Sequence, residues 1–295
     1  MSFSEQDRTH LPADPSDPAR RDFVRAAVGS GFAAAALPVT AQTVKTDSAG
    51  LTAGEVTVMV GDFKMPAYRA MPASAAGAKL PVVLVVSEIF GVHEHIADVA
   101  RRFAKLGYLA IAPELFVRQG DAQSYGEISK LLAEVVNKVP DAQALGDLDA
   151  CVAWAGANGG DTGRLGITGF CWGGRITWLY AAHNPSLKAA VAWYGQLQGM
   201  PSELKPKNPI DLVGQLKAPV LGLYGAEDQG IPVAAVDKMK AALATGNAAA
   251  KASQFVVYPG ASHAFHADYR PSYKKDAAED GWKRCVAWFK AHGVA

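Results

Sequence analysis

Residues 165–174 read Leu-Gly-Ile-Thr-Gly-Phe-Cys-Trp-Gly-Gly, an apolar run that leads into a cysteine with glycines on both sides. The run from Leu165 to Phe170 predicts a buried strand, and Gly173–His183 predicts the helix that follows it. Glycines suit such a turn because a Cβ atom would crowd the helix against the strand. The pattern G-x-C-x-G therefore predicts a strained turn that lifts the Cys171 side chain off a sheet, as its serine form does.

Cys171 has two interpretations. A free cysteine is most often a buried structural residue. At the N-terminus of a helix, however, the helix dipole favours a thiolate, which is a nucleophile. The preceding strand and the flanking glycines favour the nucleophile.

The alternation of strand and helix continues along the chain on both sides of this turn. Predicted strands are Glu55–Val60, Pro81–Ser87, Tyr108–Ala112, Leu165–Phe170, Ala189–Tyr194, Val220–Tyr224 and Phe255–Tyr258. Predicted helices are Ile96–Leu106, Tyr125–Val136, Ala142–Ala157, Gly173–His183, Val233–Ala244 and Tyr273–Ala291. Continuous apolar runs such as 82–86 indicate strands covered on both faces. We therefore expect a single α/β domain over residues 42–295, with a mostly parallel, doubly wound sheet and helices on both faces.

The composition of the 295 residues excludes several classes of protein. A hydrophobic content of 49% with a formal net charge of +1 is not that of a disordered chain. The balanced charge also argues against a nucleic-acid partner, which requires a basic excess. The three cysteines (Cys151, Cys171 and Cys285) are too few and too scattered for a disulfide framework or a CxxC-type zinc site.

Residues 1–41 predict an export signal. Arg20 and Arg21 precede an uncharged apolar segment at 26–37, and small residues stand before a cleavage site ahead of Gln42. The segment is shorter than the roughly 20 residues of a spanning helix, so we expect no stable membrane insertion after cleavage. The paired arginines resemble a twin-arginine signal. This predicts the twin-arginine export machinery as a partner and a periplasmic location, cytoplasmic before export. The alternative is a surface amphipathic helix of the mature fold.

Two more predicted strands end in polar residues. Asp228 follows the next-to-last strand, where it could orient an imidazole or simply cap a turn. His263 follows the last strand, where it could be a base or an ordinary surface or core histidine. Ligands bind beyond the carboxyl ends of the strands in such sheets, so we expect Cys171, Asp228 and His263 to meet. Nucleophile, acid and base in this chain order are typical of α/β-hydrolases.

Glu88 and Ile89 follow the early strand Pro81–Ser87. This position predicts the backbone N–H groups of Ile89 and Trp172 as the donors of an oxyanion hole. Glu88 should lie near Cys171, where an ionised carboxylate opposes a thiolate. The alternative for Glu88 is a salt-bridged residue at a strand end.

Four segments resemble the dienelactone hydrolase family, also called carboxymethylenebutenolidases: E-I-F-G at 88–91, G-F-C-W-G-G at 169–174, G-A-E-D at 225–228 and H-A-F at 263–265. The resemblance implies an α/β-hydrolase that cleaves a lactone or small carboxylic ester through an acyl-enzyme thioester, without a metal or other cofactor. It implies that Cys171 is the nucleophile and that Asp228 and His263 complete the triad. It also implies that Glu88 is the partner of Cys171 in the resting enzyme.

The chain departs from this family in its substrate-binding arginines. Position 267, four residues after His263, is an arginine in well-known members and an alanine here. The remaining candidates for substrate binding are Tyr194, Arg118, Arg175 and Arg270, each with a packing or surface role as its alternative. Dienelactone itself is therefore not assigned as the substrate.

Other functions stay open at this point. One is a broader esterase or thioesterase with the same triad, and another is a non-catalytic binding protein on the same fold. His93-Glu94-His95 could suggest a metal site, but we interpret both histidines as capping or surface groups. We interpret His183 and His266 as surface or satisfied core groups.

Overall fold

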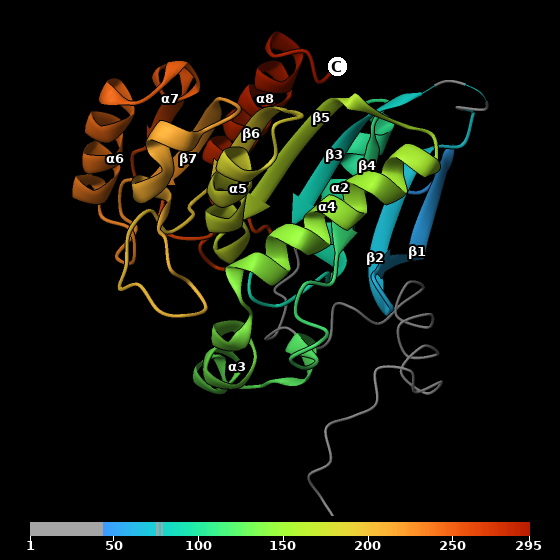
Figure 1. Ribbon diagram of the computed structural model, residues 1–295, viewed down its shortest axis with the longest axis horizontal. Helices are drawn as coiled ribbons and strands as arrows, with labels where there is room; N and C mark the ends of the chain where they lie inside the picture. The colour runs from blue at the N-terminus through green and yellow to red at the C-terminus, as the bar shows by residue number, and fades with distance from the viewer. Residues whose placement is uncertain (1–43, 75–76, 78) are drawn as a thin grey trace, which may run out of the picture.

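The computed structural model describes residues 44–74, 77 and 79–295 (Figure 1). The predicted export signal at residues 1–41 lies outside the described residues. None of the helices in the described ranges is both long enough and apolar enough to cross a bilayer.

Eight strands form one sheet in the order β1-β2-β4-β3-β5-β6-β7-β8. The strands are β1 Leu51–Val60, β2 Phe63–Pro72, β3 Leu80–Val86, β4 Leu109–Pro113, β5 Gly160–Phe170, β6 Leu187–Trp193, β7 Val220–Gly225 and β8 Gln254–Tyr258. β2 pairs antiparallel with β1 and with β4, and all other neighbours pair in parallel. Strands β3 and β4 are buried along their whole length, as the continuous apolar runs predicted.

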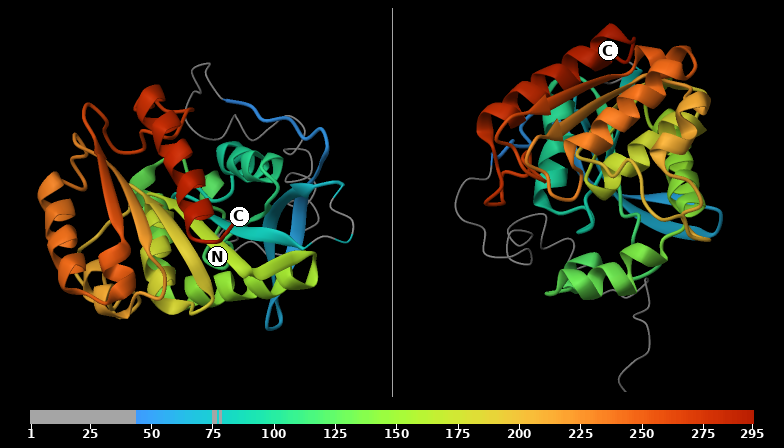
Figure 2. Two further views of the ribbon diagram at one scale, coloured as in Figure 1. Left: turned by 90° about the horizontal axis from the view of Figure 1, so that it is seen from above. Right: turned by 90° about the vertical axis from the view of Figure 1, so that its left-hand side faces the viewer.

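Helices cover both faces of this sheet (Figure 2). They are α2 Glu94–Lys105, α3 Ile128–Glu134, α4 Asp141–Ala157, α5 Trp172–His183, α6 Val233–Thr245, α7 Ala248–Ala252 and α8 Lys275–Ala291. Helices α2 and α8 pack on one face, and α4, α5 and α6 lie on the other. The predicted fold class, a mostly parallel α/β sheet of the α/β-hydrolase type, is confirmed.

Strand β2 and the short helix α7 were missed, and one predicted helix was too long. Strand β2 was missed because Phe63–Pro72 holds two prolines and two basic residues, which weaken a strand pattern. The helix predicted over Tyr125–Val136 is the short helix α3 between two 3₁₀ turns, Ala122–Ser124 and Val136–Lys138. Leu131 is the buried residue of α3, so little packing supports a longer helix there.

The segment ahead of β1 is bound to α2 and to the loop after β8. The backbone N–H of Val44 donates to Asp268 Oδ2 over 3.0 Å, and that of Thr46 donates to Asp98. The Arg101 Nε atom donates in turn to the carbonyl oxygen of Thr46 over 2.7 Å. Residues just beyond the predicted cleavage site are therefore part of the folded domain.

Candidate active site

Cys171 occupies a strained turn between β5 and α5. Its backbone lies at φ 54° and ψ −114°, in a region that residues with a side chain rarely adopt. The glycines around it let the turn close: a Cβ atom on Gly169 would lie 2.3 Å from the Gly173 carbonyl oxygen, and one on Gly173 would lie 2.4 Å from the Val86 carbonyl oxygen. The turn presents a partly exposed Cys171 at the start of α5, as the motif predicted.

Asp228 and His263 form a hydrogen-bonded pair. His263 Nδ1 lies 2.7 Å from Asp228 Oδ2, and the Asp228 side chain is buried. The other Asp228 oxygen accepts the backbone N–H groups of Gly230 and Ile231, at 2.9 and 3.0 Å. These bonds fix the carboxylate, which in turn fixes the ring of His263.

His263 lies between this carboxylate and the Cys171 sulfur. Burial lowers the pKa of His263, but hydrogen bonds with Asp228 and Cys171 outweigh it and raise the pKa to about 10. The raised pKa makes the ring a strong proton acceptor beside the Cys171 sulfur. The structure thus brings together the three side chains that the sequence predicted to meet.

Tyr194 lies beside this pair, at the end of β6. Its ring centroid is 5.1 Å from that of His263, and its φ of 37° marks a second strained residue at the same sheet edge. The Tyr194 hydroxyl is buried and has no hydrogen-bond partner among the described residues. Burial, with the nearby charge of Glu88, raises the pKa of Tyr194. The hydroxyl is therefore neutral near pH 7.

Glu88 lies at the same edge but does not bond to Cys171. Its Oε2 atom lies 3.2 Å from His93 Nε2, and both side chains are almost fully buried. Burial raises the pKa of Glu88, but the hydrogen bond and charge of His93, with the charge of His95, lower it to about 2. The resemblance implied Cys171 as the resting partner of Glu88; the structure pairs Oε2 with His93, and Oε1 is buried with no hydrogen-bond partner among the described residues.

The interpretation of His93 and His95 as capping or surface groups was wrong. They are 5% and 3% exposed, and His93 makes no side-chain bond to cap α2. His95 Nδ1 lies 3.0 Å from Asp268 Oδ1. Each ring pairs with a buried carboxylate: His93 with Glu88, five residues before it, and His95 with Asp268, which is distant in sequence. Within the described ranges no group of three or more His, Cys, Asp or Glu side chains is arranged to hold a metal ion.

The other two histidines differ from each other. His266 is buried against the rings of Phe170 and Trp193, and burial lowers its pKa, which leaves the ring neutral. Its Nδ1 atom has no partner among the described residues, so it is a core histidine that is not fully satisfied. His183 is a surface group, and its Nε2 atom pairs with Asp149 at 2.7 Å.

Arg118 and Arg175 are held in ion pairs within the fold. Arg118 makes two bonds to Asp147, at 2.6 and 2.8 Å, and stacks on Phe63. Arg175 makes two bonds to Asp141, at 2.6 and 2.9 Å. A bidentate carboxylate occupies the face of the guanidinium that would bind a substrate carboxylate. These contacts favour the packing alternative for both arginines.

Arg270 has a different setting. Its guanidinium lies 4.8 Å from the ring centroid of Phe90, in the loop that carries Glu88, and interacts with the Tyr269 hydroxyl. No carboxylate forms an ion pair with it among the residues that the structure describes. Ala267, at the position of the family arginine, is fully buried. Arg270 is therefore the candidate cation that the structure places beside the Glu88 loop.

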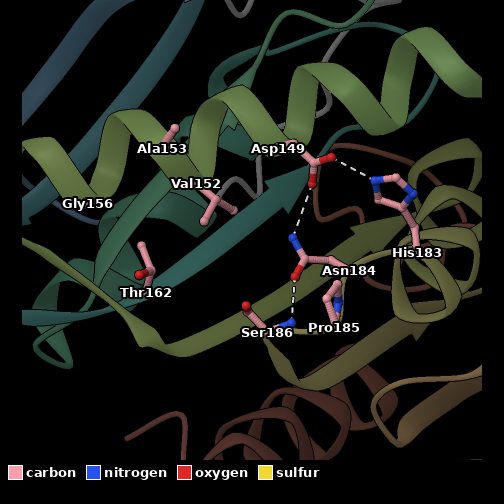
Figure 3. Close-up of a pocket in the computed structure, with 9 residues that line it drawn as sticks. All are labelled: Asp149, Val152, Ala153, Gly156, Thr162, His183, Asn184, Pro185 and Ser186. Carbon is pink, nitrogen blue, oxygen red and sulfur yellow. Dashed lines mark hydrogen bonds and ion pairs between the residues drawn. The ribbon is translucent and has the colours of Figure 1, made fainter.

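A separate surface groove of about 640 Å³ lies along α4 and the end of α5 (Figure 3). Its polar members are linked by hydrogen bonds, with Asp149 between His183 and Asn184. None of the residues that line it is Cys171, Asp228 or His263. The groove is thus distinct from the candidate site.

Similarity to known proteins identifies the family of this chain. The model of the dienelactone hydrolase family matches residues 65–293. The chain belongs to the dienelactone hydrolase family. A carboxymethylenebutenolidase homologue of Methylorubrum extorquens is 61% identical over 94% of each chain, and one of Escherichia coli K12 is 56% identical over 90% of this chain and 96% of its own. The crystal structure of a dienelactone hydrolase homologue from Klebsiella pneumoniae, 58% identical, superposes with a TM-score of 0.79 over 81% of this chain and 98% of its own.

This member of the dienelactone hydrolase family is a hydrolase of the carboxymethylenebutenolidase type. The sequence analysis missed two residues of its site, His93 and Tyr269. His93 stands five residues after Glu88, across a turn, and Tyr269 packs its ring 4.9 Å from that of His93. The His93-Glu94-His95 motif is visible in the sequence, but the carboxylate partners of its two histidines become evident only in the fold.

Proposed function

We propose that this hydrolase cleaves a lactone or a small carboxylic ester with Cys171 as its nucleophile, His263 as its acid and base, and Asp228 as the residue that orients His263. The observation that carries the proposal is the position of the His263 ring, which lies between the Asp228 carboxylate and a sulfur on a strained turn. In an activated nucleophile of this kind, a base lies beside the nucleophile and a third group orients the base. Here these are His263, Cys171 and Asp228, respectively.

The proposed reaction has two steps. The Cys171 thiolate attacks the carbonyl carbon, and the oxyanion faces the backbone N–H groups of Trp172 and Ile89. Trp172 is the first residue of α5, so its N–H has no carbonyl acceptor within the helix. Each aligned donor contributes about 2.7–4 kcal/mol to the transition state. His263 then protonates the departing alkoxide, and a thioester remains.

In the second step water attacks the thioester. His263, now neutral, takes a proton from this water, and the carbonyl collapse releases the carboxylic acid and the Cys171 thiolate. Asp228 keeps the proton on Nδ1 during both steps, so Nε2 is the nitrogen that exchanges protons. No metal or organic cofactor takes part in the proposed sequence.

Two features support a class of substrate. Tyr194 offers a neutral hydroxyl beside His263, and Arg270 offers a cation beside the Glu88 loop. These groups suit an ester or lactone with an anionic or hydrogen-bonding substituent. The buried Ala267 in place of the family arginine favours a broader esterase or thioesterase as the second candidate.

The test is a substrate profile of lactones, p-nitrophenyl esters and thioesters, with Cys171→Ala beside wild type. We expect Cys171→Ala to lose about 10³-fold or more in kcat/KM, because the residue forms the covalent intermediate. Cys151→Ala is the matched control, since Cys151 is a buried free thiol away from the site. Equal turnover in wild type and Cys171→Ala would remove Cys171 from the mechanism, and no turnover of any ester by wild type would favour a binding protein.

We also propose that residues 1–41 direct export through the twin-arginine machinery to the periplasm. Arg20, Arg21 and the apolar segment after them support this proposal. A protein that is exported in its folded state can keep its nucleophilic cysteine as a free thiol. All three cysteines are free thiols in the structure.

A further inference from the structure

The loop over residues 88–92, which follows β3, carries one of the two proposed oxyanion donors, the backbone N–H of Ile89. The chain enters this loop in contact with α5, since a Cβ atom on Gly173 would lie 2.5 Å from the Ser87 carbonyl oxygen. Trp172, which carries the other proposed donor, directly precedes Gly173. The Ile89 N–H donates to no backbone carbonyl among the described residues. The start of the loop is therefore fixed beside α5.

The far end of the loop is held by Glu114, the residue that follows β4. The backbone N–H of Val92 donates to Glu114 Oε1 over 2.9 Å. Gly91 turns the chain here with a φ of 72°, and a Cβ atom on it would lie 2.6 Å from Glu114 Oε2. The Gln123 side chain donates to the carbonyl oxygen of Val92 over 3.4 Å. The N–H and the carbonyl oxygen of Val92 are thus both bound by side chains of the segment after β4.

Glu114 lies at the same edge of the sheet and is fixed by it. Strands β3 and β4 pair in parallel, so both end at this edge. The Glu114 backbone N–H donates to the carbonyl oxygen of Pro66 in β2 over 3.0 Å. Phe116, two residues further on, is buried, and its ring centroid lies 4.7 Å from that of Trp172. The segment after β4 therefore contacts both parts of the chain that carry a proposed oxyanion donor.

We propose that Glu114 is a positioning residue: by accepting the Val92 N–H it fixes the 88–92 loop and so holds the Ile89 N–H in the oxyanion hole. The proposal rests on the proposed function, because the oxyanion forms in the same acyl transfer to Cys171. A donor stabilises that oxyanion only when it lies about 2.7–3.1 Å from the charged oxygen. The Glu114 carboxylate acts through the loop and needs no contact with the substrate.

The loss of this acceptor releases the far end of the loop. A catalytic group that is misplaced by about 1 Å can lower the rate about 10²-fold. The loss falls on the transition state, because negative charge develops on the carbonyl oxygen there, so kcat should fall and KM should change little. In alkylation by iodoacetamide the Cys171 sulfur displaces iodide from a saturated carbon. No oxyanion forms in that reaction, so its rate should not depend on the loop.

The first experiment measures kcat and KM for p-nitrophenyl acetate in the full chain. Glu114→Ala removes the acceptor, so kcat should fall at least tenfold while KM stays within threefold of wild type. Glu114→Gln keeps an oxygen that can accept the Val92 N–H, so its kcat should stay within threefold of wild type. Glu127→Ala is the matched control and should behave as wild type, since Glu127 is an exposed carboxylate that pairs with Lys130 at the start of α3.

The second experiment measures alkylation of Cys171 by iodoacetamide, followed by mass spectrometry. In Glu114→Ala its rate should stay within twofold of wild type. Equal slowing of hydrolysis and alkylation would indicate a purely structural role and overturn the proposal. An unchanged kcat in a folded Glu114→Ala variant would also overturn it.

Should Glu114→Ala fail to fold, Glu114→Asp decides, because its shorter side chain keeps the charge but draws the carboxylate back from Val92. We expect a fall of at least threefold in its kcat, with KM and alkylation as in wild type, and a smaller fall would overturn the proposal. Failure of the proposed function itself is distinguishable, because Cys171→Ala would then hydrolyse the ester as wild type does, whatever the Glu114 variants do.

Discussion

The His263 imidazole makes the stability of the folded chain depend on pH. The ordinary pKa is 6.5 and the folded value is raised to about 10 by the bonds with Asp228 and Cys171. The folded state therefore binds this proton more tightly than the unfolded state does. The resulting stabilisation is complete below pH 6.5 and is lost as pH rises through about 10. Calorimetry measures this effect. Across this pH range the melting temperature of wild type should fall by more than that of the His263→Gln variant.

His183→Gln is the matched control for this measurement. His183 also pairs with an aspartate, at 2.7 Å, but it lies on the surface at the C-terminal end of α5, whereas Cys171 precedes the first residue of that helix. Its substitution should leave the alkaline loss of melting temperature as in wild type. An equal loss in wild type and His263→Gln would show that the proton of His263 does not contribute.

For single residues, the sequence was sufficient to predict the positions of those that directly follow a strand. Cys171, Asp228 and His263 meet because parallel strands end at one edge of the sheet. The partner of Glu88 could not be predicted in the same way. His93 comes within reach of Glu88 through a turn in which Val92 N donates to Glu114 Oε1 at 2.9 Å, and its burial depends on Tyr269, which is distant in sequence.

The turn between β5 and α5, which carries Cys171, requires glycine at position 173 because α5 lies against the end of β3 there. A methyl group on Gly173 would lie 2.4 Å from the Val86 carbonyl oxygen and 2.5 Å from that of Ser87, and backbone atoms cannot turn aside as a flexible side chain does. We expect Gly173→Ala to destabilise the fold by about 1–3 kcal/mol through overpacking. It should also lower kcat/KM, because the shift separates Cys171 from His263. Urea unfolding and ester hydrolysis measure the two effects.

Gly146→Ala is the control within a helix. Gly146 lies inside α4, and a Cβ atom there would meet nothing within 4 Å. The same substitution should therefore stabilise the fold by about 0.5–1 kcal/mol, since glycine is the poorer helix former. A Gly173→Ala variant as stable and active as wild type would contradict the close contact of α5 with the end of β3.

Elements were predictable where one pattern dominated and were missed where patterns conflicted. β3 carries an unbroken apolar run, and β5 ends in the mostly apolar segment Leu165–Phe170; both segments were predicted as strands, although β5 begins earlier, at Gly160. β2 pairs with β1 over ten residues despite Pro66 and Pro72, because tertiary pairing overrides a weak strand pattern. The segment around α3 has an apolar pattern but little to pack against, so it forms only a short helix.

On the scale of the whole molecule, contacts between segments distant in sequence connect the start of the described chain to the candidate site. Val44 N bonds to Asp268, which receives His95, and His95 stacks on the imidazole that holds Glu88. A cut ahead of Gln42 leaves Val44 and this chain of contacts in place. The predicted signal can thus be removed without loss of the contacts that reach the site.

The export proposal predicts a dependence on two particular arginines. A receptor that reads paired guanidinium groups does not accept lysine in their place, since the planar, fork-shaped cation differs from an ammonium. In a Gram-negative host, Arg20→Lys with Arg21→Lys should therefore keep the full-length protein in the cytoplasm and out of the periplasmic fraction. Arg25→Lys, four residues further on, should leave export intact. Mass spectrometry of the exported chain should place its first residue at Gln42. A periplasmic yield that is equal in the double variant and in Arg25→Lys would show that residues 1–41 do not act as a twin-arginine signal, whatever the activity of the domain that follows.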